Sequence, residues 1–358
     1  MNVLGLDIGG ANVKAATADG DTLTLPFAVW KKSQLLTETL RNMVARQLQV
    51  SPHLVAMTMT AELADCFLTK AEGVSFVIRA VERAFDGVPL RIWLTSGEFA
   101  EPADACELPT LVAAANWHAL ATWAARAVPR GPALLIDVGS TTADIIPLLD
   151  GQPIPYGLND VDRLLSGELV YTGVRRTPCM AVAAVVPLRD QECPLAAELF
   201  ATMADVHVIN GRIREDSDDC DTADGRPLVR EFALNRLAHM VCCDRTEIED
   251  SELAAIAQFL AERQVLQVRH AVERVLRRFP QPRGHGDRVN VLLCGSGAFL
   301  AEAATAAFPP ETFHEPLILA DMFHKCVSSA ACAFAVARLA NDRCGDDLLQ
   351  TTSLPVPR

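Results

Sequence analysis

The sequence predicts an α/β protein with two domains. Its 358 residues suffice for about two domains with sizeable cores, and 50% of them are hydrophobic. Residues 3–16 and 134–145 repeat one pattern, in which an apolar strand ends in Asp-x-Gly and a second strand follows. Later, an apolar strand at 291–294 leads through a Gly-x-Gly turn at 295–297 into a helix. Strands that alternate with helices are typical of α/β proteins.

The first of these stretches predicts a hairpin with polar residues at and near its turn. Its apolar run ends in Asp7, Gly9-Gly10 turns the chain, and Asn12 and Lys14 then alternate with apolar residues, as in a second strand. Glycine amides can approach an anion closely, and a neighbouring carboxylate suits hydrated Mg²⁺ on phosphate oxygens. The stretch therefore predicts a site for a metal-bound phosphate or diphosphate, although a plain hairpin with a glycine turn explains it equally well.

The composition excludes several kinds of partner. A net charge of −13 and a pI near 5.1 argue against a nucleic-acid or anionic-membrane surface, which would need a basic excess. Asp7 interrupts the first apolar run, unlike a signal peptide, and the eleven cysteines have no regular spacing. The uncharged run 108–125 contains Pro109, Asn116 and His118 and predicts a buried helix. We expect a cytoplasmic protein with small-molecule substrates and no nucleic-acid or membrane partner, and leave a homo-oligomer open.

A strand at 54–60 ends beside two hydroxyls and two carboxylates. Thr58 and Thr60 share one face of this strand, and Glu62 and Asp65 lie three residues apart on one face of the helix expected to follow. A functional role and a role in the first helical turn explain Glu62 equally, whereas the helical role is favoured for Asp65. The other elements expected in this half are helices at 35–50, 76–85 and 116–127 and a strand at 90–94.

A Pro-Arg-Gly-Pro segment at 129–132 predicts a domain boundary. We expect a first domain at 1–129, a second domain at 130–345 and a tail at 346–358. The second domain opens on the repeated hairpin, in which Asp137 matches Asp7. The other matches are Gly139 for Gly9, Ser140 for Gly10 and Asp144 for Lys14, with Thr141 and Thr142 between them.

The segment 151–232 is the least regular and predicts an insertion that binds substrate. It contains Arg175 and Arg176, whose guanidinium groups could bind a carboxylate or diphosphate, although in a strand at most one of them enters the site. The acidic run 215–224 lacks the spacing of a calcium loop and is expected to be exposed, with 221–227 compact enough to contact a substrate.

A long helix is expected at 253–279, before the third glycine turn. The amides of Gly295 and Gly297 precede a helix expected at 300–307, and amides at a helix N-terminus suit an anion or a nucleoside.

Two Asp-x-Gly hairpins followed by a strand-Gly-x-Gly-helix resemble the actin, hexokinase and sugar-kinase superfamily. This resemblance implies a two-domain actin-like ATPase (ribonuclease H-like) architecture in which the hairpins face each other across a central cleft. Residues 6–14, 58–67 and 136–145 together look like the hydantoinase/oxoprolinase-related proteins linked to tetrahydromethanopterin C1 transfer. That group is similar to the ether-forming synthases of methanofuran biosynthesis, whereas the chain lacks the extra length of true hydantoinases and oxoprolinases.

The narrower resemblance implies a transferase that condenses a furylmethyl diphosphate with the phenol of a γ-glutamyltyramine-like acceptor and releases diphosphate. It implies a Mg²⁺ cofactor and a general base, for which Glu62 is the first candidate and Asp65 the second. An ATP-dependent small-molecule kinase and a non-catalytic nucleotide-binding sensor remain the alternatives. The roles expected are metal binding by Asp7, Asp137 and Asp144, charge neutralisation by Lys14, and substrate or phosphate binding by Gly9, Gly10, Asn12, Gly139, Ser140, Thr141, Thr142, Arg175, Gly295 and Gly297.

Overall fold

The computed structural model describes residues 1–279, 288–322 and 330–351 and confirms the predicted α/β class. Contacts divide the chain into two units. The first unit comprises Met1–Leu135, Ile146–Leu165 and the described residues from Leu317 onward, and the second comprises Ile136–Ile145 and Ser166–Pro316.

A six-stranded sheet forms the centre of the first unit. Its strands are β1 (Val3–Ile8), β2 (Asn12–Thr17), β3 (Thr22–Pro26), β4 (Leu54–Met59), β5 (Leu90–Trp93) and β6 (Phe99–Ala100). Their order is β3-β2-β1-β4-β5-β6, in which β2 is antiparallel to β1 and β3, β4 is parallel to β1 and β5, and β6 is antiparallel to β5. Every residue of β1 and β4 is buried, as continuous apolar strands covered on both faces should be.

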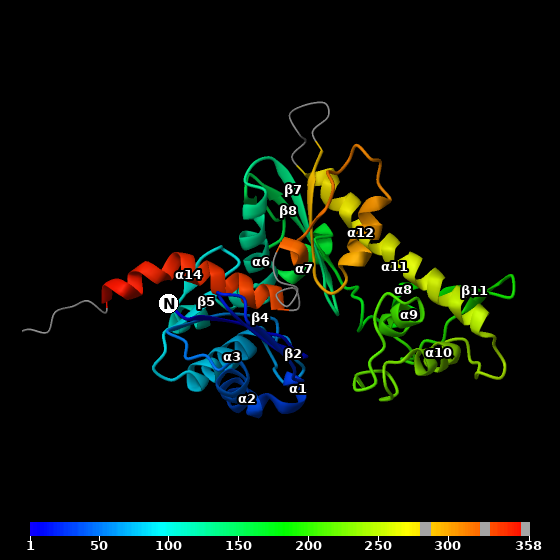
Figure 1. Cartoon of the computed structure of the whole chain (residues 1–358), viewed down its shortest axis with the longest axis horizontal. Coiled ribbons are helices and arrows are strands. Elements are labelled where there is room, and N and C mark those ends of the chain that lie inside the picture. The colour runs from blue at the N-terminus through cyan, green and yellow to red at the C-terminus, as the bar shows by residue number, and fades with distance from the viewer. Residues whose placement is uncertain (280–287, 323–329, 352–358) are drawn as a thin grey trace, which may run out of the picture. The chain divides into compact units, whose positions relative to one another are not determined.

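Helices cover both faces of this sheet. Figure 1 shows α2 (Leu36–Asn42) and α3 (Lys70–Ala84) on one side, and α6 (Asn116–Ala124) and α14 (Ala331–Thr351) on the other. The buried residues of α3 recur every three or four positions, which gives the helix an apolar face toward the core. The shorter helices are α1 (Val29–Lys32), η1 (Ser33–Leu35), η2 (Met43–Leu48), α4 (Pro102–Glu107), α5 (Pro109–Val112), η3 (Ala125–Ala127), α7 (Asp160–Ser166) and α13 (Leu319–Met322).

A second sheet repeats the strand order of the first. It contains β7 (Pro132–Val138), β8 (Ala143–Leu149), β9 (Gln152–Pro153), β10 (Leu169–Val170), β13 (Asn290–Cys294) and β14 (Leu317–Ile318). The order is β10-β8-β7-β13-β14, with β9 paired to β8. With β9 set aside, both sheets follow the order 3-2-1-4-5 in chain sequence, β6 being added to the first, and this is the order of the predicted ribonuclease H-like architecture.

Helices and one hairpin make up most of the second unit. Its core gathers apolar residues of the 179–260 region, such as Met203, Leu237 and Leu260. The elements are α8 (Cys179–Val182), the hairpin of β11 (Val185–Leu188) and β12 (Gln191–Pro194), α9 (Met203–Ile209), α10 (Arg230–His239), α11 (Asp250–Arg278) and α12 (Ala298–Ala306).

Several boundaries differ from those expected from the sequence. The expected cut near residue 129 gave 130–345 to one domain, whereas the contacts group Ile146–Leu165 and α14 with the first unit, because α14 packs on β1, β4 and α6. The insertion at 151–232 contains seven short helices and strands in place of irregular chain. The expected tail is helical up to Thr351, and its last part, 352–358, lies outside the described residues.

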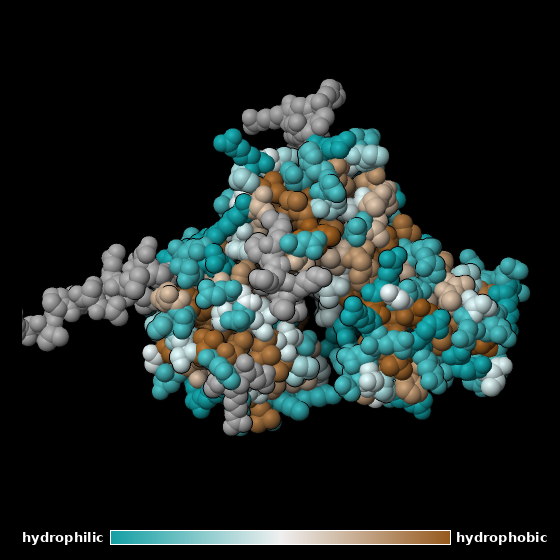
Figure 2. Space-filling view, viewed as in Figure 1, coloured by the Kyte–Doolittle hydropathy of each residue, from teal (hydrophilic) through white to brown (hydrophobic). Residues whose placement is uncertain are grey.

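The surface mixes polar and apolar side chains. In Figure 2, brown hydrophobic atoms gather over α2 and α3 and over β7 and β8, with teal hydrophilic atoms around them. Within the described ranges, no helix is long and apolar enough to cross a membrane.

Candidate active site

Asp7 lies near the end of β1 with Lys14 directly opposite it on β2. The antiparallel register pairs Asp7 with Lys14, and the parallel register places Thr58 of β4 on its other side. Only 4% of Asp7 is exposed, and burial raises the pKa of its carboxyl, against the opposing influence of Lys14 and of a hydrogen bond with the Asn116 side chain. Its Oδ1 atom is buried without a hydrogen-bond partner. This carboxylate therefore keeps an oxygen for a group that the protein itself does not supply.

Glu62 lies in the turn after β4 and is 1% exposed. Burial raises the pKa of its carboxyl to about 7, even though the backbone amides of Glu62 and Ala114 bind the carboxylate and Lys70 lies nearby. The Oε2 atom has no hydrogen-bond partner. A carboxyl group with a pKa near neutrality and an unpaired buried oxygen fits a general acid or base.

The helix expected to begin at Glu62 is absent, and this changes the interpretation of both acids. Residues 61–69 form turns, α3 begins only at Lys70, and Thr69 caps it by accepting from the backbone N–H of Glu72 at 3.1 Å. Glu62 therefore does not stabilise a first helical turn. Asp65 lies exposed in the same loop.

A turn that the sequence analysis missed connects Asp7 and Glu62. Ala114 has a left-handed φ of 49°, its backbone amide binds the Glu62 carboxylate, and two residues later Asn116 hydrogen-bonds to Asp7. The Asn116 Oδ1 accepts from the N–H of Trp117 at 2.8 Å, so its NH₂ group is the part that faces the carboxylate. A non-glycine residue at positive φ is uncommon and clusters at functional sites. The signal available in the sequence was a single Asn at the start of an apolar helix.

An ion pair ties the start of α3, directly after the Glu62 loop, to α7. Lys70 Nζ lies 3.3 Å from Asp160 Oδ2, and both residues influence the pKa of Glu62. On the same helix, the guanidinium of Arg163 stacks on the ring of Trp117, 4.0 Å from its centroid, and is 1% exposed. Lys70 thus lies near Glu62, as Lys14 does near Asp7.

The second unit contains the repeated hairpin, joined by two further turns. The Gly139 N–H donates to Thr142 O at 2.9 Å, and the Gly9 N–H donates to Asn12 O at the same distance in the first hairpin. The Gly9 and Gly139 amides therefore close the turns, although the sequence analysis assigned them to phosphate. Each of these bonds encloses a two-residue tip, which is Gly10-Ala11 in the first hairpin and Ser140-Thr141 in the second.

Gly173 and Gly295 pack directly on the second hairpin. A Cβ atom on Gly173 would lie 2.4 Å from Thr141 N, and one on Gly295 would lie 2.4 Å from Asp137 Oδ1. Gly295 also has φ = 85°, which favours glycine. The Gly297 N–H donates to Val138 O at 2.8 Å. Three turns that are far apart in the sequence therefore meet around Asp137, and Gly173 was not among the predicted site residues.

Arg175 is already engaged within the protein. Its Nη2 atom donates to Asp219 Oδ2 at 2.5 Å, and its backbone N–H donates to Ser140 O at 3.1 Å. Asp144, on β8, lies opposite Leu169 in the ladder with β10. The sequence analysis gave Arg175 to a substrate, whereas here it links the acidic loop to the hairpin tip.

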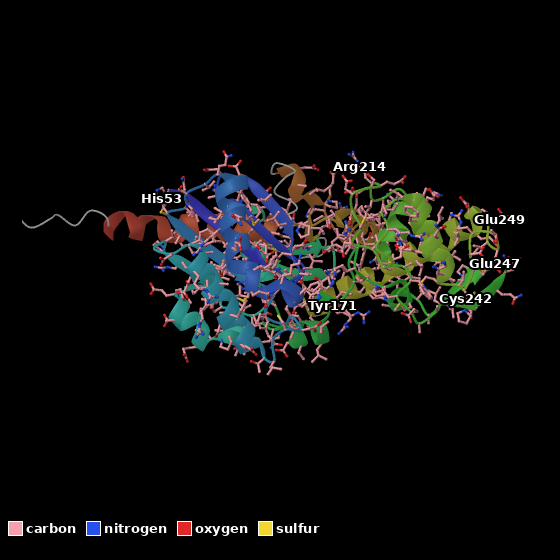
Figure 3. The ribbon with its side chains drawn as sticks, turned by 90° about the horizontal axis from the view of Figure 1, so that it is seen from below. His53, Tyr171, Arg214, Cys242, Glu247 and Glu249 are labelled. Atoms are coloured by element: carbon pink, nitrogen blue, oxygen red, sulfur yellow. The ribbon has the colours of Figure 1, made fainter. Side chains whose placement is uncertain are left out.

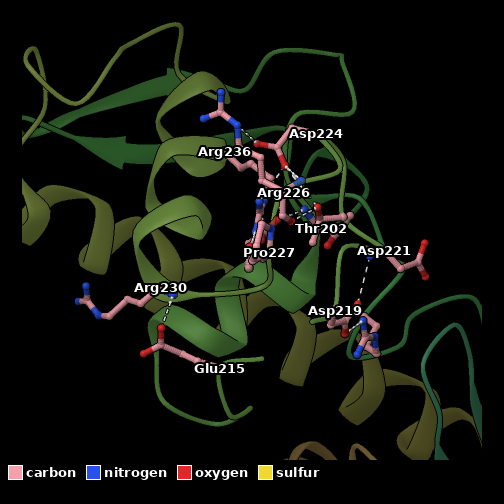
Figure 4. A network of polar contacts seen from close by, with 12 residues as sticks. Thr202, Glu215, Asp219, Asp221, Asp224, Arg226, Pro227, Arg230 and Arg236 are labelled. Carbon is pink, nitrogen blue, oxygen red and sulfur yellow. Dashed lines mark hydrogen bonds and ion pairs between the residues drawn. The ribbon is translucent and has the colours of Figure 1, made fainter. Parts of the chain in front are cut away.

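The acidic loop is held by a buried arginine, as Figure 4 shows. Arg236 is 1% exposed, donates to Asp205 at 2.8 Å and to Asp224 at 2.8 Å, and thereby ties the loop to α9 and α10. Asp224 also accepts from the N–H of Arg226 at 3.1 Å. These contacts make the loop ordered, in agreement with the compact turn expected at 221–227.

The cysteines do not build a metal site in the described part of the chain. Cys242, labelled in Figure 3 with Glu247 and Glu249, is exposed, and its neighbour Cys243 is partly buried. Among the described residues, no three His, Cys, Asp or Glu side chains gather as they would around a metal ion. A metal held by one or two carboxylates and a substrate would not need such a cluster.

Comparison with known proteins identifies the family. The model of the hydantoinase/oxoprolinase family matches residues 53–343. A "(4-{4-[2-(gamma-L-glutamylamino)ethyl]phenoxymethyl}furan-2-yl)methanamine synthase" of Methanocaldococcus jannaschii is 34% identical over 340 residues, which cover 94% of this chain and 97% of the relative. A synthase with the same name from Methanococcus vannielii is 27% identical and covers 58% of this chain and 89% of the relative.

Among solved structures, the nucleotide-free structure of acetone carboxylase has a TM-score of 0.52 at 9% identity, covering 94% of this chain and 70% of that chain. At this identity the likeness concerns the fold alone. The match over most of the sequence, together with the full-length relative, shows that the chain belongs to the hydantoinase/oxoprolinase family.

Proposed function

We propose that the protein condenses a furylmethyl diphosphate with the phenol of a tyramine-type acceptor and releases diphosphate. The observation that carries this proposal is the 34% identity, over 94% of the chain, to a synthase whose named product contains a phenoxymethyl-furan ether. In such a reaction the CH₂–O bond to the diphosphate breaks and the electron pair leaves with the diphosphate. The phenol oxygen forms the new bond to the CH₂ carbon and loses its proton.

The hairpin tips supply the groups that suit the leaving diphosphate. Backbone N–H groups at Gly10-Ala11 and Ser140-Thr141 would bind phosphate oxygens, and Lys14, paired with Asp7 in the strand register, would neutralise charge as it grows on the leaving group. We propose these roles for each hairpin separately. The expectation that both hairpins face one cleft stays a prediction.

The residues present fit a magnesium ion. Asp7 has a buried carboxylate oxygen without a hydrogen-bond partner, and carboxylate oxygens are the ligands that Mg²⁺ prefers. Asp7 would hold an ion at the first hairpin, and Asp137 and Asp144 are the candidates for the same role at the second hairpin. When bound, Mg²⁺ supplies charge stabilisation for a diphosphate.

Glu62 is the proposed base for the phenol proton. Its pKa of about 7 lets it be ionised at neutral pH and still accept a proton, and its Oε2 is the unpaired atom at which a proton would arrive. The amide of Ala114 holds the carboxylate in place. Asp65 is the weaker candidate because its side chain is exposed to water in the same loop.

A small-molecule kinase is the alternative that the actin-like strand order favours. The deciding assay incubates the protein with Mg²⁺, a furylmethyl diphosphate and tyramine, with and without ATP, and follows diphosphate and the aryl ether by mass spectrometry. Ether formation without ATP supports the synthase. If product forms only with ATP, and ADP accumulates one for one, the kinase assignment replaces it. Nucleotide binding without any product would support the sensor.

A further inference from the structure

A buried network of hydrogen-bonded side chains supports the hairpin of the second unit. Gln264 of α11 is 0% exposed, and its Nε2 atom donates to Thr172 Oγ1 at 3.0 Å and to Gly173 O at 2.9 Å. Its Oε1 atom lies 2.8 Å from Nε2 of His207, a residue of α9 that is 1% exposed. Three elements are thus joined by hydrogen bonds where water has no access.

The chemistry of these groups fixes which of them donates and which accepts in this hydrogen-bond network. The Gly173 carbonyl only accepts, so the amide nitrogen of Gln264 must face it, and the Gln264 oxygen must accept from His207. His207 is therefore the Nε2–H tautomer. Burial lowers the pKa of its imidazole, although the bond to Gln264 opposes this effect, and the ring stays neutral at pH 7.

One end of this hydrogen-bond network lies at the hairpin tip. Gly173 lies so close to Thr141 that a Cβ atom would come within 2.4 Å of Thr141 N, and the Gly173 N–H is held by Thr177 Oγ1 at 2.8 Å. At the other end, the His207 ring contacts Phe299 of α12 edge-on at 5.1 Å, two residues beyond the third glycine turn. These hydrogen bonds therefore reach the Gly173 turn directly, and at the other end they lead to α12 just after the third glycine turn.

We infer that Gln264, oriented by His207, is a positioning residue that fixes the Gly173 turn against Ser140-Thr141 and so presets the second hairpin for a diphosphate. Its relevance to diphosphate binding rests on the proposed function, whereas its action on the hairpin does not. Nothing in the sequence pattern pointed to Gln264, because its partners lie about 60 and 90 residues away along the chain.

Hydrogen exchange measured by mass spectrometry tests the positioning directly. Gln264→Leu removes both donors at nearly constant volume, and Gln258→Leu is the matched control, since it makes the same change at an exposed site on the same helix. The variant breaks the buried hydrogen bonds of Gln264 with Thr172, Gly173 and His207. Since the loss of one such bond corresponds to about a tenfold effect, we expect amides in 136–145 and 170–176 to exchange at least about tenfold faster, with α10 unchanged. Equal exchange in both variants, or faster exchange throughout the unit, would overturn the inference.

A second pair of variants covers the case in which Gln264→Leu does not fold. His207→Gln keeps an N–H donor near the Gln264 oxygen, whereas His207→Leu does not. We expect only the leucine variant to loosen the two loops. If both variants behave alike, His207 does not orient Gln264.

Ligand binding separates this inference from the proposed function. Titration with inorganic pyrophosphate in the presence of Mg²⁺ should give a Kd about tenfold weaker in Gln264→Leu than in Gln258→Leu, and turnover should show a raised KM for the diphosphate substrate with an unchanged KM for the phenol. An unchanged Kd contradicts a role in diphosphate binding. If the wild-type protein binds no pyrophosphate and forms no ether while the local exchange effect persists, the proposed function fails and the positioning stands.

Discussion

Replacing Glu62 by Gln should make the protein more stable and much less active. Burial raises the pKa of this carboxyl to about 7 from an ordinary value of 4.5. Each pKa unit corresponds to 1.36 kcal/mol, so keeping the charged form buried costs about 3 kcal/mol above pH 7. Between these pKa values the folded chain binds more protons than the unfolded chain, and the wild-type stability therefore falls as the pH rises from 4.5 to 7. Glutamine has the same shape and no charge, so the variant escapes this cost.

Urea denaturation at pH 5 and pH 8, followed by tryptophan fluorescence, measures the effect in the relevant unit. All four tryptophans, Trp30, Trp93, Trp117 and Trp123, lie in the first unit with Glu62. We expect Glu62→Gln to gain up to about 3 kcal/mol over the wild type at pH 8 and little at pH 5. Glu82→Gln, an identical change at an exposed position on α3, should gain nothing at either pH.

The catalytic half of this prediction uses the same variants. As the base for the phenol proton, Glu62 should give a rate that rises with pH through an apparent pKa near 7, and Glu62→Gln should be slower by about a hundredfold or more. The Mg²⁺ requirement should not change. A variant that turns over at the wild-type rate, or that is no more stable than the wild type at pH 8, would refute the reasoning from burial.

Three further outcomes follow from the geometry. Asp7→Asn and Asp137→Asn should each leave the circular dichroism spectrum unchanged and weaken Mg²⁺-dependent pyrophosphate binding at least tenfold by calorimetry, and full binding in both would remove them from the metal site. Gly173→Ala should lower the Tm and the affinity for pyrophosphate, since its Cβ would lie 2.4 Å from Thr141 N; a variant with wild-type Tm and affinity contradicts the close contact. Burial lowers the pKa of His118 to about 4, so wild-type stability should fall by about 3 kcal/mol as the pH falls from 6.5 to 4, and His118→Gln should not show this loss in urea titrations.

Local patterns predicted those parts of the site that are themselves local. Each hairpin is encoded within about a dozen consecutive residues, and the glycine that closes each turn, Gly9 or Gly139, follows two residues after the aspartate. The strand order then repeats, because each half builds its sheet outward from its own hairpin. The fold class could therefore be predicted from three short stretches.

Contacts between distant segments could not be predicted in this way. Asn116 meets Asp7 across more than 100 residues, and Arg175 meets Asp219 across 44. No periodicity encodes such pairs, because they depend on how helices pack on the sheets. Arg175 illustrates the consequence, since two adjacent arginines favour an anionic ligand in the sequence, whereas the structure satisfies one of them with an aspartate of the same chain.

In this protein a buried carboxylate with partners on both oxygens belongs to a structural cluster, whereas buried carboxylates with one unpaired oxygen belong to the candidate active site. Asp205 is as buried as Glu62, yet its Oδ1 accepts a hydrogen bond from Arg236 Nε at 2.8 Å and lies 2.7 Å from Nη2 of the same guanidinium. Its Oδ2 accepts the N–H of Thr202 at 3.0 Å. Asp7 and Glu62 each keep a buried oxygen without a partner. An unpaired buried polar atom costs about 1–3 kcal/mol, and the left-handed Ala114 that serves Glu62 adds to this cost. Asn116 and Ala114 of one turn bind the carboxylates of Asp7 and Glu62. We therefore infer that the first unit carries this cost for a ligand and a proton, whereas the Arg236 cluster holds a loop.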